Sequence, residues 1–163
     1  MKHAATSPDA SPPMSDAARD RALKLWVVMA RAFAAVERRV EADVAAHDLT
    51  IAEFGILEVL HHKGPLLLGE IQRKILVTSG GITYLVDRLE KKGLVRREDC
   101  PTDRRARFAV LTPAGTRLIA RIFPQHAAAI GHALAGLSAR EQDEATALLR
   151  RLGTTAAEAE TPE

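Results

Sequence analysis

The chain has 163 residues, enough to bury a hydrophobic core without disulfide bonds or a structural metal. A single cysteine excludes an intrachain disulfide framework and favours a reducing cytoplasm, and no apolar run resembles a signal peptide or the roughly 20 residues of a membrane span. The net charge of +2 identifies no partner by itself, and an aromatic content of 4% favours packed helices over a sheet-rich core.

The N-terminal part of the chain is predicted to be one long helix. Residues 1–15 are rich in proline and serine and are expected to form a disordered tail. From Asp16 to His47 there is neither glycine nor proline, and apolar residues repeat at spacings of three and four. We therefore expect a helix over residues 16–47 with a continuous apolar stripe.

Two shorter helices are expected next. Thr50-Ile51-Ala52-Glu53 matches a capping box, in which a threonine and a glutamate pair with the first backbone amides of a helix. This helix is predicted to run to about His62, where Gly64-Pro65 stops it. A short helix then follows from about Leu68 to Ile75.

Residues 78–107 are the most informative segment, and they open with a helix. Apolar residues at positions i, i+3, i+4 and i+7 give this helix one apolar face, formed by Ile82, Leu85, Val86 and Leu89. The other side of the helix is polar and carries Gly80, Thr83, Tyr84, Asp87, Arg88 and Lys91. Thr78 or Ser79 is expected to cap its start, and Gly93 is expected to end it.

A two-stranded hairpin is predicted directly after this helix. The strand-like runs Leu94–Glu98 and Ala106–Leu111 flank a basic turn. Residues 73–107 hold ten basic and five acidic side chains, a net charge of +5, whereas residues 138–163 have a net charge of −3. A polar helix face beside an arginine-tipped hairpin favours DNA binding, with the helix in the major groove and the tip in the adjacent minor groove.

The C-terminal part is predicted to be helical again. Thr112-Pro113 opens a long helix, inside which Pro124 is expected to produce a kink or a break. Ser138-Ala139-Arg140-Glu141 is a second capping box and opens a last helix that ends near Gly153. Residues 154–163 are expected to form a frayed tail.

The predicted helices carry more apolar surface than one small core can cover, which favours a homodimer over intrachain packing in a monomer. We therefore predict a mainly α-helical single domain over residues 16–153. In it, a winged helix-turn-helix with a small β-hairpin wing spans residues 50–111, and dimerisation helices span residues 16–47 and 113–153. Eight apolar residues are expected at the twofold interface: Leu25, Ala32, Val36, Ile119, Ile122, Phe123, Ile130 and Leu149.

The motifs of residues 78–107 also carry a resemblance to a known family. In chain order they are Ser79-Gly80-Gly81-Ile82-Thr83, Asp87-Arg88-Leu89-Glu90-Lys91-Lys92-Gly93-Leu94-Val95 and Asp103-Arg104-Arg105. With the helices around them, from about Leu23 to Gly153, they resemble the MarR family of bacterial transcription regulators. Three segments are similar to the branch of that family that responds to quinones and catechols: Leu25–Phe33, Ser79–Tyr84 and Cys100–Arg105. The resemblance implies an obligate homodimer on an inverted-repeat operator. A repressor without a cofactor is the favoured function, and activation is the alternative.

The predicted DNA contacts fall into two groups. In the wing, Arg105 is expected to enter the minor groove, beside Arg104, and Asp103 to orient its guanidinium; a plain turn-forming role is the alternative for Asp103. On the helix, base edges and nearby phosphates are expected to contact Ser79, Gly80, Thr83 and Tyr84. Phosphate contacts, which position a protein without reading sequence, are expected of Arg73, Arg88, Lys91, Arg96 and Arg97.

Two modes of sensing stay open. Cys100 lies among wing arginines, which favour the thiolate that reacts with quinones and peroxides, although a lone cysteine is also compatible with no role. The other mode is an apolar pocket for a phenolic ligand, unless the same side chains are simply core. Its candidate residues are Trp26, Met29, Phe33 and Phe54.

Other functional classes have weaker support in the sequence. The adjacent His61 and His62 suggest a metal-responsive regulator, but neighbours on a helix point about 100° apart and do not easily share a metal, so no metal site is predicted. A nonspecific architectural DNA-binding protein would share the basic segment but bind all duplexes alike. An enzyme is disfavoured because the chain lacks a phosphate-binding loop and the GxSxG and HExxH motifs.

Overall fold

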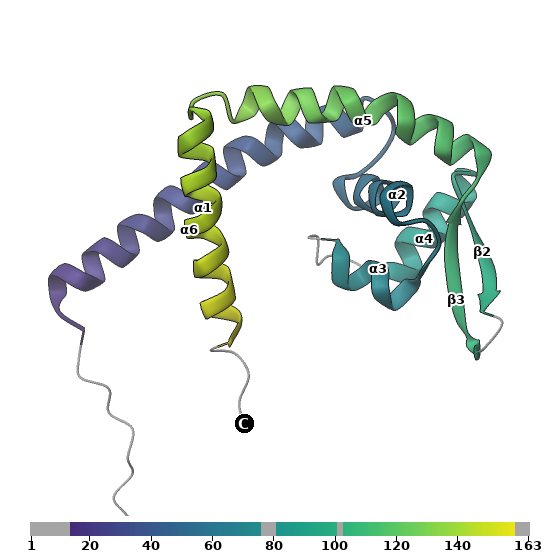
Figure 1. Cartoon of the computed structure of the whole chain (residues 1–163), viewed down its shortest axis with the longest axis horizontal. Coiled ribbons are helices and arrows are strands. Elements are labelled where there is room, and N and C mark those ends of the chain that lie inside the picture. The colour runs from purple at the N-terminus through teal and green to yellow at the C-terminus, as the bar shows by residue number, and fades with distance from the viewer. Residues whose placement is uncertain (1–13, 76–80, 101–102, 159–163) are drawn as a thin grey trace, which may run out of the picture. The chain divides into compact units, whose positions relative to one another are not determined.

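The computed structural model describes residues 14–75, 81–100 and 103–158, and the side chains of all of these except residues 103–105. The elements in chain order are α1 (Asp16–Ala45), α2 (Ile51–Lys63), β1 (Leu66–Leu67), α3 (Leu68–Lys74), α4 (Ile82–Lys91), β2 (Val95–Cys100), β3 (Asp103–Leu111), α5 (Pro113–Ala133) and α6 (Ala139–Glu158) (Figure 1). Residues 1–35 and residues 36–163 form two units, so α1 begins in one and ends in the other. No helix of the described residues is both long enough and apolar enough to cross a bilayer.

Helix α1 begins and ends close to the predicted positions. At its start the Ser15 hydroxyl accepts the backbone N–H of Ala18 at 3.3 Å. At its end the chain leaves the helix after Ala45, and Asp48 takes a φ of 56° in the left-handed region, which turns the chain toward α2. Within residues 14–35 the helix exposes several large apolar side chains: Leu23, Leu25, Trp26, Val27, Val28 and Phe33.

The capping box predicted for α2 is confirmed. The Thr50 hydroxyl accepts the Glu53 N–H at 3.2 Å, and the Glu53 carboxylate accepts the Thr50 N–H at 2.9 Å. The helix ends at Lys63, before Gly64 with a φ of 76°, which suits glycine. A short strand, β1, follows, which the sequence pattern did not reveal.

Helix α4 begins later than expected. Ile82 is its first residue and Gly81 is its N-cap, whereas the caps considered from sequence, Thr78 and Ser79, lie outside the described residues. Gly93 has a φ of 69° and ends the helix region as predicted. The apolar face is confirmed, because Leu85, Val86 and Leu89 are buried.

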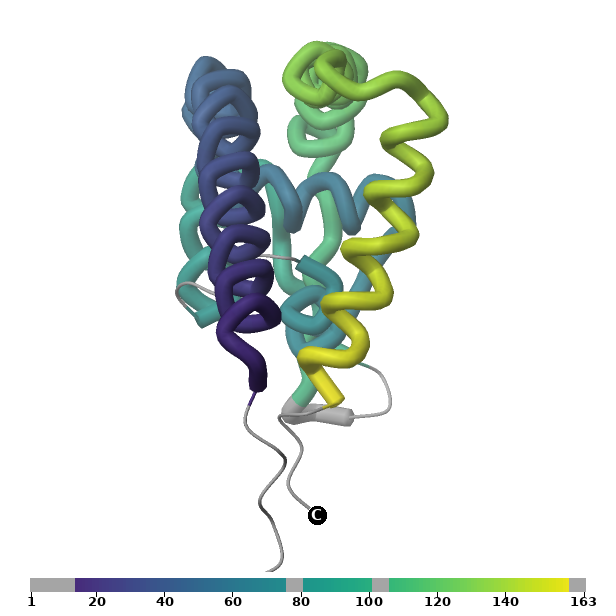
Figure 2. Tube along the Cα trace, turned by 90° about the vertical axis from the view of Figure 1, so that its left-hand side faces the viewer, coloured from purple at the N-terminus to yellow at the C-terminus, as the bar shows by residue number. Residues whose placement is uncertain are grey.

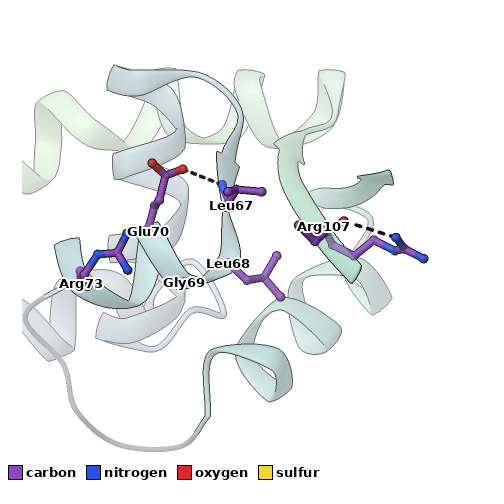
Figure 3. Close-up of a pocket in the computed structure, with 7 residues that line it drawn as sticks. Leu67, Leu68, Gly69, Glu70, Arg73 and Arg107 are labelled. Atoms are coloured by element: carbon purple, nitrogen blue, oxygen red, sulfur yellow. Dashed lines mark hydrogen bonds between the residues drawn. The ribbon is translucent and has the colours of Figure 1, made fainter. Parts of the chain in front are cut away.

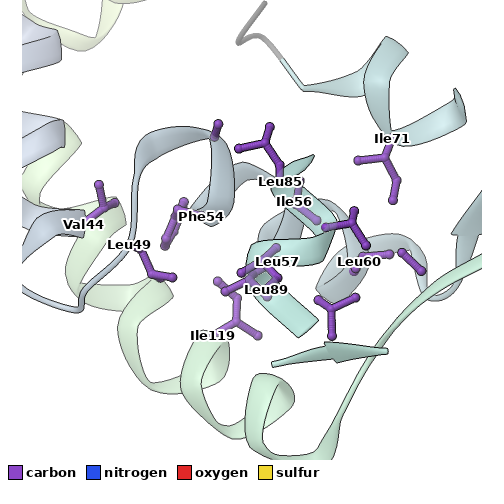
Figure 4. Close-up of a cluster of buried hydrophobic side chains, with 14 of the residues drawn as sticks. Val44, Leu49, Phe54, Ile56, Leu57, Leu60, Ile71, Leu85, Leu89 and Ile119 are labelled. Atoms are coloured by element: carbon purple, nitrogen blue, oxygen red, sulfur yellow. The ribbon is translucent and has the colours of Figure 1, made fainter. Parts of the chain in front are cut away.

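The hydrophobic core of residues 36–163 brings together side chains from α2, α3, α4 and α5. Figure 4 shows Leu57 of α2, Leu89 of α4 and Ile119 of α5 meeting near its centre, and all three are fully buried. Ile119 and Ile122, both expected at a twofold interface, are therefore core residues of one chain, with 0% and 1% exposure. This corrects the expectation for those two residues, because a partner chain cannot reach a side chain that its own chain encloses.

The wing is part of a three-stranded antiparallel sheet with the order β1-β3-β2. Its hairpin strands extend further toward the tip than predicted, since Cys100 pairs with Asp103 and only residues 101–102 connect the strands. The register shifts between Asp99 and Cys100. Arg104 and Arg105 therefore lie on strand β3 rather than in a long turn.

Helix α5 runs through Pro124 without a break, so of the two expected alternatives, a kink or a split, the split does not occur. The Ser138 capping box is confirmed, since the Ser138 N–H donates to the Glu141 carboxylate at 2.8 Å. The Ser138 hydroxyl, which donates to the same carboxylate at 2.7 Å, and the Ser138 backbone N–H together lower the pKa of Glu141. Helix α6 continues to Glu158, beyond the predicted end near Gly153, and leaves α5 in a different direction after residues 134–138 (Figure 2).

Gly115 makes the start of α5 sensitive to added volume. A Cβ at this position would lie 2.0 Å from the backbone oxygen of Leu94, which enters the wing. We expect Gly115→Ala to lower the free energy of unfolding by roughly 1–3 kcal/mol, the usual effect of overpacking, in urea denaturation. Gly131→Ala is the control in the same helix, because a Cβ added there would meet no neighbouring side chain or strand within 4 Å; it should stabilise by up to about 1 kcal/mol. Equal stability of the two variants would contradict the clash.

Candidate nucleic-acid interface

The side of α4 opposite its buried face is polar and exposed. Thr83, Tyr84 and Lys91 are exposed, and 59% of the Tyr84 side chain is accessible. Ser79 and Gly80, also predicted to contact bases, lie outside the described residues. The exposed face offers a hydroxyl, a phenol and an ammonium group, which can all donate hydrogen bonds to base edges or phosphates.

Arg97 of β2 holds the wing against α4. Its guanidinium donates to Asp87 Oδ1 at 2.6 Å and to the Thr83 carbonyl at 3.1 Å, and it also pairs with the Glu90 carboxylate. The Arg97 backbone N–H donates to the same Glu90 side chain at 2.8 Å. Thr83, Asp87 and Glu90 follow one another along one side of the helix. Arg97 therefore has carboxylate partners, and as a phosphate ligand it would first have to release them.

Arg88 is also engaged within the chain. Its Nε lies 3.1 Å from the carboxylate of Glu53, which is fully buried on α2. Arg96 pairs with Glu98 on the same strand and keeps 57% of its side chain exposed. Both pairs lower the positive charge available to DNA.

Arg73, Lys74 and Lys91 are exposed and form no ion pair with any described residue. Arg73 borders a hollow of about 350 Å³ between the start of α3 and strand β3. Figure 3 shows Arg73 and Arg107 on either side of Leu68. Because no described carboxylate neutralises them, these three cations are available to counter the charge of a phosphate.

The tip of the wing carries the remaining predicted contacts. Asp103, Arg104 and Arg105 form the first residues of β3, and their side chains lie outside the described atoms, so the minor-groove contact of Arg105 stays a prediction. Cys100 is half-buried at the end of β2, next to the shift in register.

A second cavity, of about 370 Å³, lies among α2, the end of α1 and α5. Most of its lining is apolar, and it includes Val40, Val44, Ile51, Phe54 and Val59. Polar groups at its wall are Glu58, His62, Lys63, Lys74 and His126. Phe54 is thus at the cavity, whereas Trp26 and Phe33 are exposed and Met29 half-buried on the part of α1 that belongs to the other unit.

Of the residues that line this cavity the sequence analysis predicted only Phe54, and His126 is the buried polar one among those that it missed. It is 6% exposed, its Nδ1 lies 2.8 Å from Asp43 Oδ2, and its ring centroid lies 4.1 Å from that of Phe54. Asp43 and His126 are 83 residues apart, so no local pattern connects them. His61 and His62 have ring centroids 5.2 Å apart, and the described residues contain no group of three or more potential ligands that could hold a metal.

Comparisons with known proteins agree with this geometry. A model of the MarR family matches residues 47–106. The HTH-type transcriptional regulator MhqR of Bacillus subtilis (strain 168) is 42% identical over 137 residues, which cover 84% of this chain and 94% of that protein.

Solved structures share the fold. The structure of Sco3205, a MarR family transcriptional regulator from Streptomyces coelicolor in complex with DNA, has a TM-score of 0.78 at 26% identity and covers 95% of this chain and 94% of that one. A mutant MarR from Escherichia coli complexed with operator DNA has a TM-score of 0.70 at 22% identity, over 82% and 96% of the two chains, and shows the fold alone. The chain belongs to the MarR family, a family of DNA-binding transcription regulators.

Proposed function

We propose that the protein is a homodimeric repressor that binds a pseudo-palindromic operator and is released by a phenolic or quinone compound. The observation that carries the DNA-binding part is the exposed polar face of α4 beside the wing. A twofold dimer would place two such helices about one helical turn of DNA apart, in successive major grooves. Exposed leucines on α1 and α6 supply the apolar surface that pairing would cover.

Selection from a random-sequence duplex library by the full-length protein tests this proposal. The enriched duplex should contain an inverted repeat and bind at least about a thousandfold more tightly than a scrambled duplex at physiological salt. Equal affinity for both duplexes would favour a nonspecific architectural protein instead.

We propose the cavity beside Phe54 as the effector site. Its size suits a small aromatic ring, and the apolar wall with two lysines, two histidines and one glutamate fits a phenol, whose hydroxyl can both donate and accept hydrogen bonds. The resemblance to the quinone- and catechol-responsive branch supports the same class of ligand. A ligand there would act only through a different affinity for the DNA-bound and free conformations.

The competing mode is covalent. The Cys100 thiolate would add to a ring carbon of a quinone, forming a carbon–sulfur bond, and the electron pair moves to the conjugated carbonyl oxygen, which takes up a proton from water. The hydrogen on the attacked carbon then shifts to the second carbonyl oxygen, which gives an aromatic hydroquinone thioether with no external oxidant or reductant. The adduct would then alter the wing beside the phosphates. Arg104 and Arg105, close in sequence, support this mode because nearby cations favour thiolate. Asp99 beside Cys100 and the carboxylate partners of Arg96 and Arg97 oppose it.

Two substitutions separate these modes in an operator-release assay with catechol and benzoquinone. Cys100→Ser should leave release intact, whereas Val59→Phe, which fills the cavity from α2, should raise the concentration needed for half release by about tenfold or more. A third substitution, Trp26→Ala, tests whether residues 14–35 contribute to the response to these compounds. Loss of release in Cys100→Ser alone would establish the covalent mode, and a normal response in all three variants would reject both sites.

A further inference from the structure

Glu53 carries a buried charge that its capping role does not explain. Its side chain has 0% exposure. One carboxylate oxygen accepts the Thr50 N–H at 2.9 Å and the Lys92 ammonium at 3.2 Å, and the other lies 3.1 Å from the Arg88 Nε as an ion pair without hydrogen-bond geometry. A glutamine serves equally at this position of a capping box, so the cap alone needs no charge.

Both cations lie at the C-terminal end of α4, the helix that we propose faces DNA. Arg88 lies in the last turns of α4 and Lys92 follows its last residue, so the two are one turn apart and on the same side. Lys92 also donates to the backbone oxygen of Asp48, in the turn between α1 and α2. The carboxylate of Glu53 thus connects the start of α2 to two successive turns at the end of α4.

This connection fixes how α4 is rotated about its own axis. Tyr84 lies one turn before Arg88 on nearly the same side of the helix, so a rotation that moved Arg88 would move Tyr84 as well. The apolar face at Leu85, Val86 and Leu89 prevents α4 from leaving the core, but apolar packing is not directional. A charged contact at one edge adds the direction that such packing lacks.

We propose that Glu53 is a positioning residue for DNA reading: its charge orients α4 and keeps Arg88 and Lys92 away from phosphates. Without that charge the two cations would be available to phosphates of any sequence. Affinity for the operator would then fall while affinity for unrelated DNA would rise.

The variant Glu53→Gln tests this in the full-length protein, because it keeps an oxygen that can accept the Thr50 N–H, removes the charge and turns an amide donor toward one of the two cations. The probes are the duplex selected by the wild type and a scrambled duplex of the same length, titrated over a range of salt concentrations. We expect the affinity ratio between the two to fall by about tenfold or more, as for one mismatched base pair. For the scrambled duplex, the slope of the logarithm of the binding constant against the logarithm of salt concentration should become steeper by up to about 1.8, or 0.9 for each added phosphate contact.

Thr50→Ala is the matched control. It weakens the same helix start but leaves the carboxylate and both cations in place, so it should change neither the affinity ratio nor the salt dependence. An unchanged ratio and salt dependence in a folded Glu53→Gln protein would overturn the proposal.

If Glu53→Gln does not fold, Arg88→Gln and Lys92→Gln carry the test, because both side chains reach the surface. As partners of Glu53 they should lower the affinity ratio without changing the salt dependence for the operator. If each variant instead makes that slope shallower by about 0.9 and leaves the ratio of operator to scrambled affinity unchanged, Arg88 and Lys92 are phosphate contacts and the proposal is overturned.

Discussion

Replacing Leu25 by glutamate is expected to make the protein monomeric and to lower its operator affinity by at least about a hundredfold. Leu25 lies on the apolar stripe of α1 and is 58% exposed in the single chain. Pairing of two chains through this stripe would bury the new carboxylate without a cation, which costs several kcal/mol. A monomer then contacts only one half of the operator, and loses the gain from linking two sites. Sedimentation velocity and operator titration measure the two effects.

Val27→Glu is the control for this experiment. It adds the same charge to an exposed valine two positions further, about 200° round the helix and away from the stripe. It should stay dimeric and bind the operator normally. A Leu25→Glu protein that keeps its helix content and remains dimeric would place the interface on other elements.

The elements that local signals specify could be predicted from the sequence. Thr50 and Glu53 start α2 through a capping box, Thr112 caps α5, and the spacing of Leu85 and Leu89 shows the buried face of α4. Each signal involves residues within one or two helical turns, which is the range over which sequence patterns report structure.

The predictions that were wrong or missing concern contacts between elements that are distant in the sequence. The sequence shows that Ile119 is apolar, but it does not show which surface covers this side chain. In the structure the core of the same chain covers it. Arg97 fits a basic DNA-facing stretch, yet the fold brings it to Asp87 and Glu90, 10 and 7 residues away on another element. The pairing of His126 with Asp43 has no local trace at all. In all three cases the partner is set by tertiary packing, which a local sequence pattern does not report.

Replacing Arg97 by alanine is expected to lower operator affinity by about tenfold or more, and stability by roughly 1–2 kcal/mol. The substitution removes the group that joins β2 to α4 through Asp87, Glu90 and the Thr83 carbonyl. Two carboxylates are then left without their cation on the helix that approaches phosphates, and the wing loses its polar connection to that helix. Operator titration and urea denaturation measure these changes.

Arg96→Ala is the matched control, because it removes the same charge from the neighbouring position of β2. Arg96 is more exposed, at 57% against 23% for Arg97, and its partner Glu98 lies on its own strand, so its loss should leave stability within about 0.5 kcal/mol. If Arg96 contacts phosphate, its replacement should make the slope of the logarithm of operator affinity against the logarithm of salt concentration shallower by about 0.9. For Arg97→Ala the salt dependence should instead stay near that of the wild type while affinity falls, since its guanidinium is already neutralised. Equal losses of affinity with equally flattened salt dependence would show that both arginines act on DNA directly, and that the contact between Arg97 and α4 does not position the wing.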